Sequence, residues 1–424
     1  MASKQFSLVE QSGNFLTKFQ GRSANMYNSA NVLEGRIKKK YNFVGKQQNI
    51  ETQLSFSGSV GAKLLPQGNA SNVQQAVITA KKLYGRVFVD RESLKAASSN
   101  EGAFQKYLAF PVKKTVESYM RNSSRILFSD GSSVLGRGDA ATNVTGAGTV
   151  GSPYIVTISA ASWKEANWEE KDFVQIVTGL AAFPANTGGS AEGGDAVTNL
   201  LEIVEVVPAS RQIKLVGTSA HLAGLVAGPS PLAATTGLCM QRSYNAEPQG
   251  LNGALGATSG TLYGLSVARR WQATQVDAGG AGIITDMMNE VMLKTEKAFG
   301  QAPKMIVMNY NQLQKILAQL EDQKVYNLPN RNLKGALSFS GVEFMSTRGP
   351  IPMFVDRFAD EDKMYFLNDD FIERIHRPDF GWFDDDGTVF LRVADSDEYE
   401  ARYGGYMENF ITPTAHGLLS NLAK

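Results

Sequence analysis

The spacing of apolar side chains divides the chain into segments of different period. Residues 50–57 alternate between apolar and polar positions, which is the two-residue period of a half-buried strand. A stretch containing Gly and Pro follows, and residues 73–89 are strand-like again. We therefore predict an extended β-hairpin over residues 46–90. Its faces are too polar to form a core, so we expect it to find its partners elsewhere.

A helical period comes next. Apolar side chains recur at three- and four-residue spacing, which predicts a long helix over residues 101–127. Its stripe consists of Phe104, Tyr107, Leu108, Val112, Val116, Tyr119 and Met120. Pro111 interrupts the stripe and either kinks the helix or begins a second one.

Short alternating runs separated by turn-rich segments fill residues 151–243. This pattern of short strands and turns predicts a small all-β, barrel-like domain. The longest uncharged run, Leu215 to Gln241, lies at its end. Gly and Pro residues break that run, so we interpret it as strand and loop and predict no membrane contact.

The C-terminal part returns to mixed structure. Helical spacing over residues 283–292, an apolar strand over 303–309 and a second helix over 313–320 predict an α/β layer within 244–355. Asn309 or Asn311 is a suitable N-cap for the second helix. Strand-like runs then recur within 356–424. The predicted fold class is therefore α+β.

Composition narrows the class of protein. A chain of 424 residues exceeds what one hydrophobic core usually organises, so two or three domains are expected. Cys239 is the single cysteine, which excludes an intrachain disulfide and suits a reducing cytoplasm. The N-terminus lacks the apolar stretch of a signal peptide.

Charge is segregated along the chain although the net charge is near zero. Residues 1–125 hold 19 Lys and Arg against 7 Asp and Glu, whereas residues 356–400 hold 5 against 15. This asymmetry predicts that a basic surface meets an acidic one, or else forms two solvated faces of one monomer. The N-terminal arm ends in a basic cluster, Arg36–Lys40, without interleaved aromatics, so a partner subunit is its expected target rather than nucleic acid.

Catalytic and metal-binding chemistry finds no support in the residue pattern. The histidines His221, His376 and His416 are scattered, and His376, beside two arginines, is predicted to lie at the surface. Residues 146–151 match GxGxxG, but a strand rather than a helix is predicted to follow, which argues against a dinucleotide site. We therefore predict no enzyme activity, no catalytic residue, no cofactor and no metal.

The order of these parts resembles the major capsid proteins of tailed double-stranded DNA bacteriophages, whose fold is shared with herpesvirus floor domains and encapsulins. The resemblance runs over residues 41–136 and 244–424. Its most family-like strings are 82–90, 128–136 and 303–309. It implies an N-terminal arm (1–45), an extended hairpin loop (46–90), a peripheral domain with a spine helix (91–150), the inserted domain (151–243), an axial domain (244–355) and a peripheral return (356–424).

The function that this resemblance implies is self-assembly into hexamers and pentamers of an icosahedral head around the phage genome. The subunit would be assembled in the host cytoplasm and reside in the virion. Expected partners are other copies, a separate scaffold protein, a portal, a decoration protein and packaged double-stranded DNA contacted without sequence preference. An encapsulin-like compartment shell and a virion surface protein for binding or adhesion are the alternatives.

The candidate site residues are therefore those of a subunit interface. One branch of the resembling family cross-links a hairpin lysine to a neighbour's asparagine, and Lys63 is the lysine placed for this role. We expect basic side chains of the arm, hairpin and helix to meet an acidic run of an adjacent copy. The candidates are Arg36, Lys38, Lys39, Lys40, Lys63, Lys81, Lys82, Arg86, Lys113, Lys114, Asp384, Asp385 and Asp386.

Overall fold

The computed structural model of the chain describes residues 33–55, 72–92, 101–183, 185–193, 199–268, 270–283, 285–322, 342–346, 349–378, 381–383, 389–393 and 396–424. Lys63 and the acidic run Asp384–Asp386 lie outside these ranges. Among the described residues, no helix combines the length and the apolar character needed to cross a membrane.

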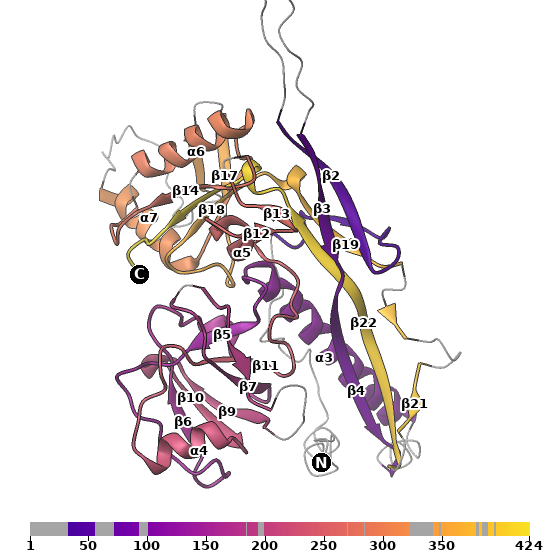
Figure 1. Cartoon of the computed structure of the whole chain (residues 1–424). Coiled ribbons are helices and arrows are strands. Elements are labelled where there is room, and N and C mark those ends of the chain that lie inside the picture. The colour runs from indigo at the N-terminus through magenta and orange to yellow at the C-terminus, as the bar shows by residue number, and fades with distance from the viewer. Residues whose placement is uncertain are drawn as a thin grey trace, which may run out of the picture.

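A long strand near the C-terminus, β22 (Glu398–Ile411), organises the first sheet. Strand β4 (Lys81–Asp90) pairs antiparallel with it over ten residues, and we call these two strands the ribbon. Shorter strands follow one another along the opposite edge of β22 and extend the sheet (Figure 1). They are β19 (Ile372–His376), β20 (Gly381–Trp382) and β21 (Leu391–Arg392), with β1 (Lys38–Lys40) parallel to β19.

The predicted long helix is present as α3 (Glu101–Leu127), which runs without a break through Pro111. A proline removes one helical hydrogen bond, and here that loss does not end the helix. Helix α3 runs beside the ribbon in Figure 1. A Cβ at Gly85 would lie 2.6 Å from the Thr115 Cγ2 atom, so this glycine permits the close approach of helix and strand.

The predicted hairpin is present as β2 (Gln47–Ser55) paired with β3 (Asn72–Thr79). The second predicted strand divides at Ala80, because β3 pairs with β2 whereas β4 pairs with β22. The hairpin was expected to find its partners elsewhere, and at its base it finds them in the main core of the same chain. Ala76 and Ile78 are fully buried in the main core, since they share one face of the alternating strand.

A six-stranded mixed sheet forms the predicted α/β layer, in the order β14-β23-β18-β15-β17-β16. Its strands are β14 (Thr274–Asp277), β15 (Met305–Met308), β16 (Val342–Ser346), β17 (Gly349–Val355), β18 (Met364–Leu367) and β23 (Gly417–Ser420). Its helices are α5 (Leu251–Gly256), α6 (Thr285–Phe299) and α7 (Tyr310–Asp322). Asn309 caps α7, because its Oδ1 accepts the N–H of Asn311 at 3.2 Å.

The segment predicted as one peripheral return, residues 356–424, serves two sheets. β18 and β23 lie in the α/β layer, whereas β19 to β22 lie in the sheet of the ribbon. The reason is long-range pairing: β23 lies between β14 and β18, with Leu418 opposite both Gln275 and Tyr365. Local periodicity does not contain that information.

The predicted all-β insertion is a seven-stranded antiparallel sheet, which we call the module. Its strands are β5 (Val134–Arg137), β6 (Tyr154–Thr157), β7 (Phe173–Thr178), β8 (Ser190–Ala191), β9 (Leu201–Val207), β10 (Gln212–Gly217) and β11 (Gly237–Met240). Its two outer strands meet through Ser159 N–H to Arg137 O at 2.9 Å and Asp139 N–H to Thr157 O at 3.0 Å. These bonds close the sheet around its own apolar core.

The module begins earlier than its predicted boundary at residue 151. β5 starts at Val134 and pairs with β11, and Leu135 and Val144 are buried in the module core. The GxGxxG stretch at residues 146–151 leads into strand β6 and not into a helix, as expected. It therefore lacks the helix N-terminus that a dinucleotide site requires.

Candidate assembly surfaces

The basic cluster of the arm is bound to the acidic C-terminal half of the same chain. β1 lies parallel to β19, with Lys38 opposite Glu373. The Lys38 Nζ atom is 2.7 Å from Asp370, and the Lys40 Nζ atom is 2.6 Å from Glu373. The lysine side chains of these pairs remain about half exposed, so each pair contributes little to stability. Of the other two candidates here, Arg36 lies over the Phe354 ring at 4.2 Å, and Lys39 is 3.4 Å from Glu34.

A buried arginine joins four segments beneath the arm. Arg374 of β19 is 1% exposed, and its Nε atom donates to Asn409 of β22 at 2.8 Å. Its Nη1 atom donates to Ser123 of α3 at 2.6 Å and also contacts Glu34, just before β1. A guanidinium presents several donors in a fixed plane, so it can bind partners from three directions. We call this set the Arg374 cluster.

The ribbon pairs its charges in the same way. Glu400 of β22 accepts from Arg86 Nε at 2.7 Å and from Arg402 Nε at 2.8 Å. Its pKa is held below the usual range because these two contacts overcome the opposing effect of burial. The predicted meeting of basic and acidic regions thus occurs within one chain at this point and at the arm. Contact between copies remains a prediction.

The other candidate residues have different surroundings. Lys81 donates to the backbone oxygen of Asn245 at 3.1 Å, in the linker that leaves the module. On α3, Lys113 and Lys114 lie 3.9 and 2.8 Å from Glu117, one helical turn away. These helix lysines are 66% and 36% exposed, so they can meet another molecule.

Sequence reasoning missed a face of the ribbon that combines cations and aromatic rings. We call it the basic face, and it lies on the side of the ribbon away from α3. It consists of Lys82, Tyr84, Arg86, Phe88, Arg377, Arg402 and Tyr406. The signal was available, because every second residue from position 82 to position 88 is a cation or an aromatic. Lys82 and Arg86 were predicted as members of a basic region, not as neighbours on one face of a strand.

The module is held to the rest of the chain by polar contacts. Arg121 of α3 lies 3.3 Å from both Glu169 and Asp172. The Lys424 Nζ atom donates to the Ala160 backbone oxygen at 2.8 Å. Lys164 contacts buried Asp360, which also binds Lys363 at 2.7 Å. Burial alone would raise the pKa of Asp360, but the two lysines together hold it well below its usual range.

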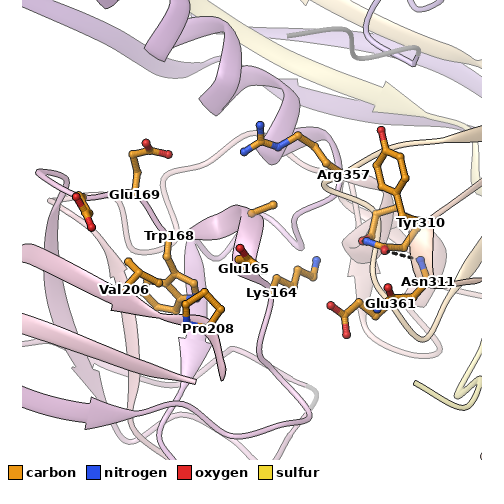
Figure 2. A pocket seen from close by; sticks show the side chains of 14 residues that line it. Lys164, Glu165, Trp168, Glu169, Val206, Pro208, Tyr310, Asn311, Arg357 and Glu361 are labelled. Carbon is orange, nitrogen blue, oxygen red and sulfur yellow. Dashed lines mark hydrogen bonds between the residues drawn. The ribbon is translucent and has the colours of Figure 1, made fainter. Parts of the chain in front are cut away.

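A cleft of about 620 Å³ opens beside these contacts, between the module and the α/β layer. Figure 2 shows Lys164, Glu165 and Trp168 on the module side and Tyr310, Arg357 and Glu361 on the other. Among the described residues, no group of three or more His, Cys, Asp or Glu side chains is placed to hold a metal ion. The cleft lining offers no nucleophile paired with a base that would indicate catalysis.

Buried titratable groups lie in the core beneath these surfaces. Glu408 accepts the backbone N–H of Gln249 at 2.6 Å, and burial raises its pKa to about 7. His376 was predicted at the surface, but it is 4% exposed and stacks on Tyr41 with ring centroids 5.1 Å apart. Burial lowers the pKa of His376 and of His416 to about 4, so both are neutral near neutral pH.

No known family model matches this sequence, and no curated protein is similar enough to count as a relative. Solved structures do match. The chain is similar to a subunit of the cyanophage A-1(L) capsid, with a TM-score of 0.56, 10% identity, and 99% and 100% of the two chains covered. It also matches the capsid of a native GTA particle (TM-score 0.46, 12% identity, 98% and 99% covered). An encapsulin complex from Synechococcus elongatus gives a TM-score of 0.43 at 8% identity, with 98% and 95% covered. The first of these likenesses shows that the chain has the fold of a phage capsid subunit.

Replacing Arg374 with alanine is expected to lower the free energy of unfolding by about 1–3 kcal/mol, because Asn409 and Ser123 would lose a buried donor, whereas Glu34 would keep Lys39 as a partner. Arg374→Lys keeps the charge but not the planar set of donors, so its loss should be smaller. Denaturant titration followed by circular dichroism measures both. The exposed Arg392 is the matched control, and its alanine variant should stay within about 0.5 kcal/mol of the parent. Equal stability of Arg374→Ala and the parent would contradict the role of the cluster.

The raised pKa of Glu408 predicts a pH dependence of stability. Between its ordinary value of 4.5 and the folded value of about 7, the folded protein holds a proton that the unfolded chain releases. The associated stability is present below pH 4.5 and is lost as the pH rises through about 7.

The free energy of unfolding of the Glu408→Gln variant, measured relative to that of the parent protein, should therefore rise by up to about 3 kcal/mol as the pH increases from 4.5 to about 8. Denaturant titration of both proteins across this range tests the expectation. His376 and His416 titrate in both proteins, so their effect cancels in the difference. A difference that does not change with pH would contradict the assignment.

Proposed function

We propose that the chain is the major capsid protein of a tailed double-stranded DNA bacteriophage. It assembles into hexamers and pentamers that form an icosahedral head, and it resides in the virion. The observation that carries the proposal is the likeness to the cyanophage A-1(L) capsid subunit, which covers 99% of this chain and 100% of that one. The agreement in length supports the proposal, because a shell subunit would use the whole chain.

The parts of the chain have corresponding roles in this proposal. The hairpin of β2 and β3 is the extended loop that lies over a neighbouring subunit, and α3 is the spine helix of the peripheral domain. The α/β layer is the axial domain around the symmetry axis of a capsomer. The module is an inserted domain on the outer surface. The polarity of the hairpin supports its role, since a two-stranded hairpin is not stable alone in water.

The expected partners follow from the same role. They are other copies of the chain, a separate scaffold protein, a portal, a decoration protein and packaged double-stranded DNA. Closed symmetry gives every copy the same neighbours, so a segment that needs a partner finds one at each position. An encapsulin-like shell with a protein cargo is the second candidate, because the same fold would serve it.

Electron microscopy of the expressed protein tests the proposal. We expect closed shells, tubes or sheets of regular subunits, and a sedimentation coefficient far above that of a monomer of 45.9 kDa. Packaged genomic DNA in particles from infected cells would identify a phage head, whereas a protein cargo would identify a compartment. A monomer or a small oligomer under all assembly conditions would contradict the shell role.

Reversing the acidic run provides a test of the contact between copies. We propose that Asp384–Asp386 of one copy meet the exposed lysines of α3, Lys113 and Lys114, of an adjacent copy. The triple change of Asp384, Asp385 and Asp386 to Lys should then impair assembly but leave the folding of the monomer unchanged. Microscopy and circular dichroism measure the two properties. Changing Lys113 and Lys114 to Glu in the same protein should restore assembly in part, and normal shells from the Asp variant would contradict the contact.

A further inference from the structure

The basic face is defined by the register of the ribbon. Gly85 points toward Thr115 of α3, so the even-numbered residues of β4 from 82 to 88 point to the opposite side. Arg402 lies opposite Arg86, and Tyr406 lies opposite Lys82, which places both on that same side.

Aromatic rings hold the cations of this face in place. The Arg86 guanidinium lies 4.8 Å from the Phe88 ring centroid, and the Arg377 guanidinium lies 4.8 Å from that of Tyr406. The Lys82 Nζ atom lies 5.6 Å from the centroid of the same Tyr406 ring. Such contacts orient a cation without neutralising it. The side chains of Arg86 and Arg402 remain 55% and 50% exposed.

The face keeps a net positive charge. Glu400 lies between Arg86 and Arg402, so it balances one of these two charges. The basic part ends after Phe88, where Asp90 lies opposite Glu398. Among the described residues, Glu400 is the carboxylate that binds both Arg86 and Arg402, so this pair of arginines keeps one positive charge that a further anion can meet.

We propose that the basic face binds the phosphate backbone of duplex DNA without reading its sequence. Lysine and arginine contacts to phosphates carry no sequence information and release counterions. Single strands are usually bound by stacking bases on open aromatic rings. Here the rings of Phe88 and Tyr406 are occupied by the cations of the face, and the third ring, Tyr84, packs edge-on against Phe383, which favours a backbone ligand over stacked bases.

The spacing of the cations fits such a ligand. Lys82 and Arg86 are four residues apart in an extended strand, which separates them by roughly 13 Å. A duplex presents about one phosphate charge per 1.7 Å of its axis, so two cations at this separation can contact phosphates of one duplex at the same time. Binding would therefore tolerate sliding along the duplex.

This inference deepens the proposed function, because packaged DNA is the duplex that a capsid subunit meets. Only the orientation of the basic face toward the interior of a shell rests on that function. Binding itself is measured on the purified full chain and does not require assembly. Failure to bind DNA and failure to form shells are therefore separate outcomes.

The experiment is a titration of a fluorescently labelled duplex of arbitrary sequence with the full chain at several salt concentrations, read by anisotropy. We expect log affinity to fall linearly with log salt. The Arg86→Gln/Arg402→Gln variant should bind more weakly, with a salt slope smaller by about 2, one for each lost phosphate contact. Circular dichroism confirms that the variant is folded.

Two further variants keep the test decisive if the double variant does not fold. Glu400→Gln removes the negative charge from the face and retains an oxygen that accepts from the arginines, so it should bind the duplex more tightly than the parent. Lys294→Gln removes an exposed lysine of α6, which lies in the α/β layer, and should leave the slope unchanged.

Four outcomes would overturn the proposal. They are no salt-dependent binding by the parent chain, a salt slope that none of the variants changes, tighter binding to a single strand of equal length, and affinity that depends on duplex sequence. If the double variant is folded, fails to form shells and still binds the duplex as the parent does, the basic face contacts another copy instead.

Discussion

The buried guanidinium of Arg374 is the constraint on which the arrangement of the chain depends. A charge at 1% exposure is stable only when its donors are bound, so Glu34, Ser123 and Asn409 must all reach it. Glu34 is 340 residues away from Arg374 in sequence, and Asn409 is 35 away. One side chain therefore fixes the start of the described chain, the C-terminal end of α3 and the long strand β22 relative to one another. The ribbon extends from this point.

The position of Arg374 also explains how the basic N-terminal segment pairs with the acidic C-terminal segment. The arm lies beside β19 because Arg374 anchors Glu34, and this position brings Lys38 and Lys40 to Asp370 and Glu373. These exposed pairs follow from the anchor and do not create it, since pairs in water contribute little. Much of the charge asymmetry in the sequence is thus satisfied inside one chain. What is left for other molecules lies on the two sides of the ribbon: helix lysines on one side and the basic face on the other.

Local periodicity predicted those elements whose side chains repeat within a few residues. The hairpin, the long helix, the all-β module and the helix–strand–helix order of the α/β layer are present as expected. Long-range pairing could not be predicted, and it explains the errors: β23 joins the α/β layer, and the module starts at Val134. The acidic partners of Arg374 and Arg86, Glu34 and Glu400, lie more than 300 residues away from them, so a single sequence shows the charges without their pairing. Ala76 and Ile78 share one face of the alternating strand, so their burial could have been predicted. The polar residues beside them indicated a hairpin without a core of its own instead.

The module differs from the rest of the chain in how it is held. Its apolar core forms a cluster separate from the main core and from the core of the α/β layer, and Ala166 of the module packs against the main core at its edge. The contacts of Arg121, Lys164 and Lys424 are instead directional and few, and the cleft separates the module from the α/β layer beside them. Apolar surface that is buried within a unit stabilises that unit alone, whereas polar contacts between units set only their relative position. A unit held in this way can change its own surface without changing the packing of the ribbon.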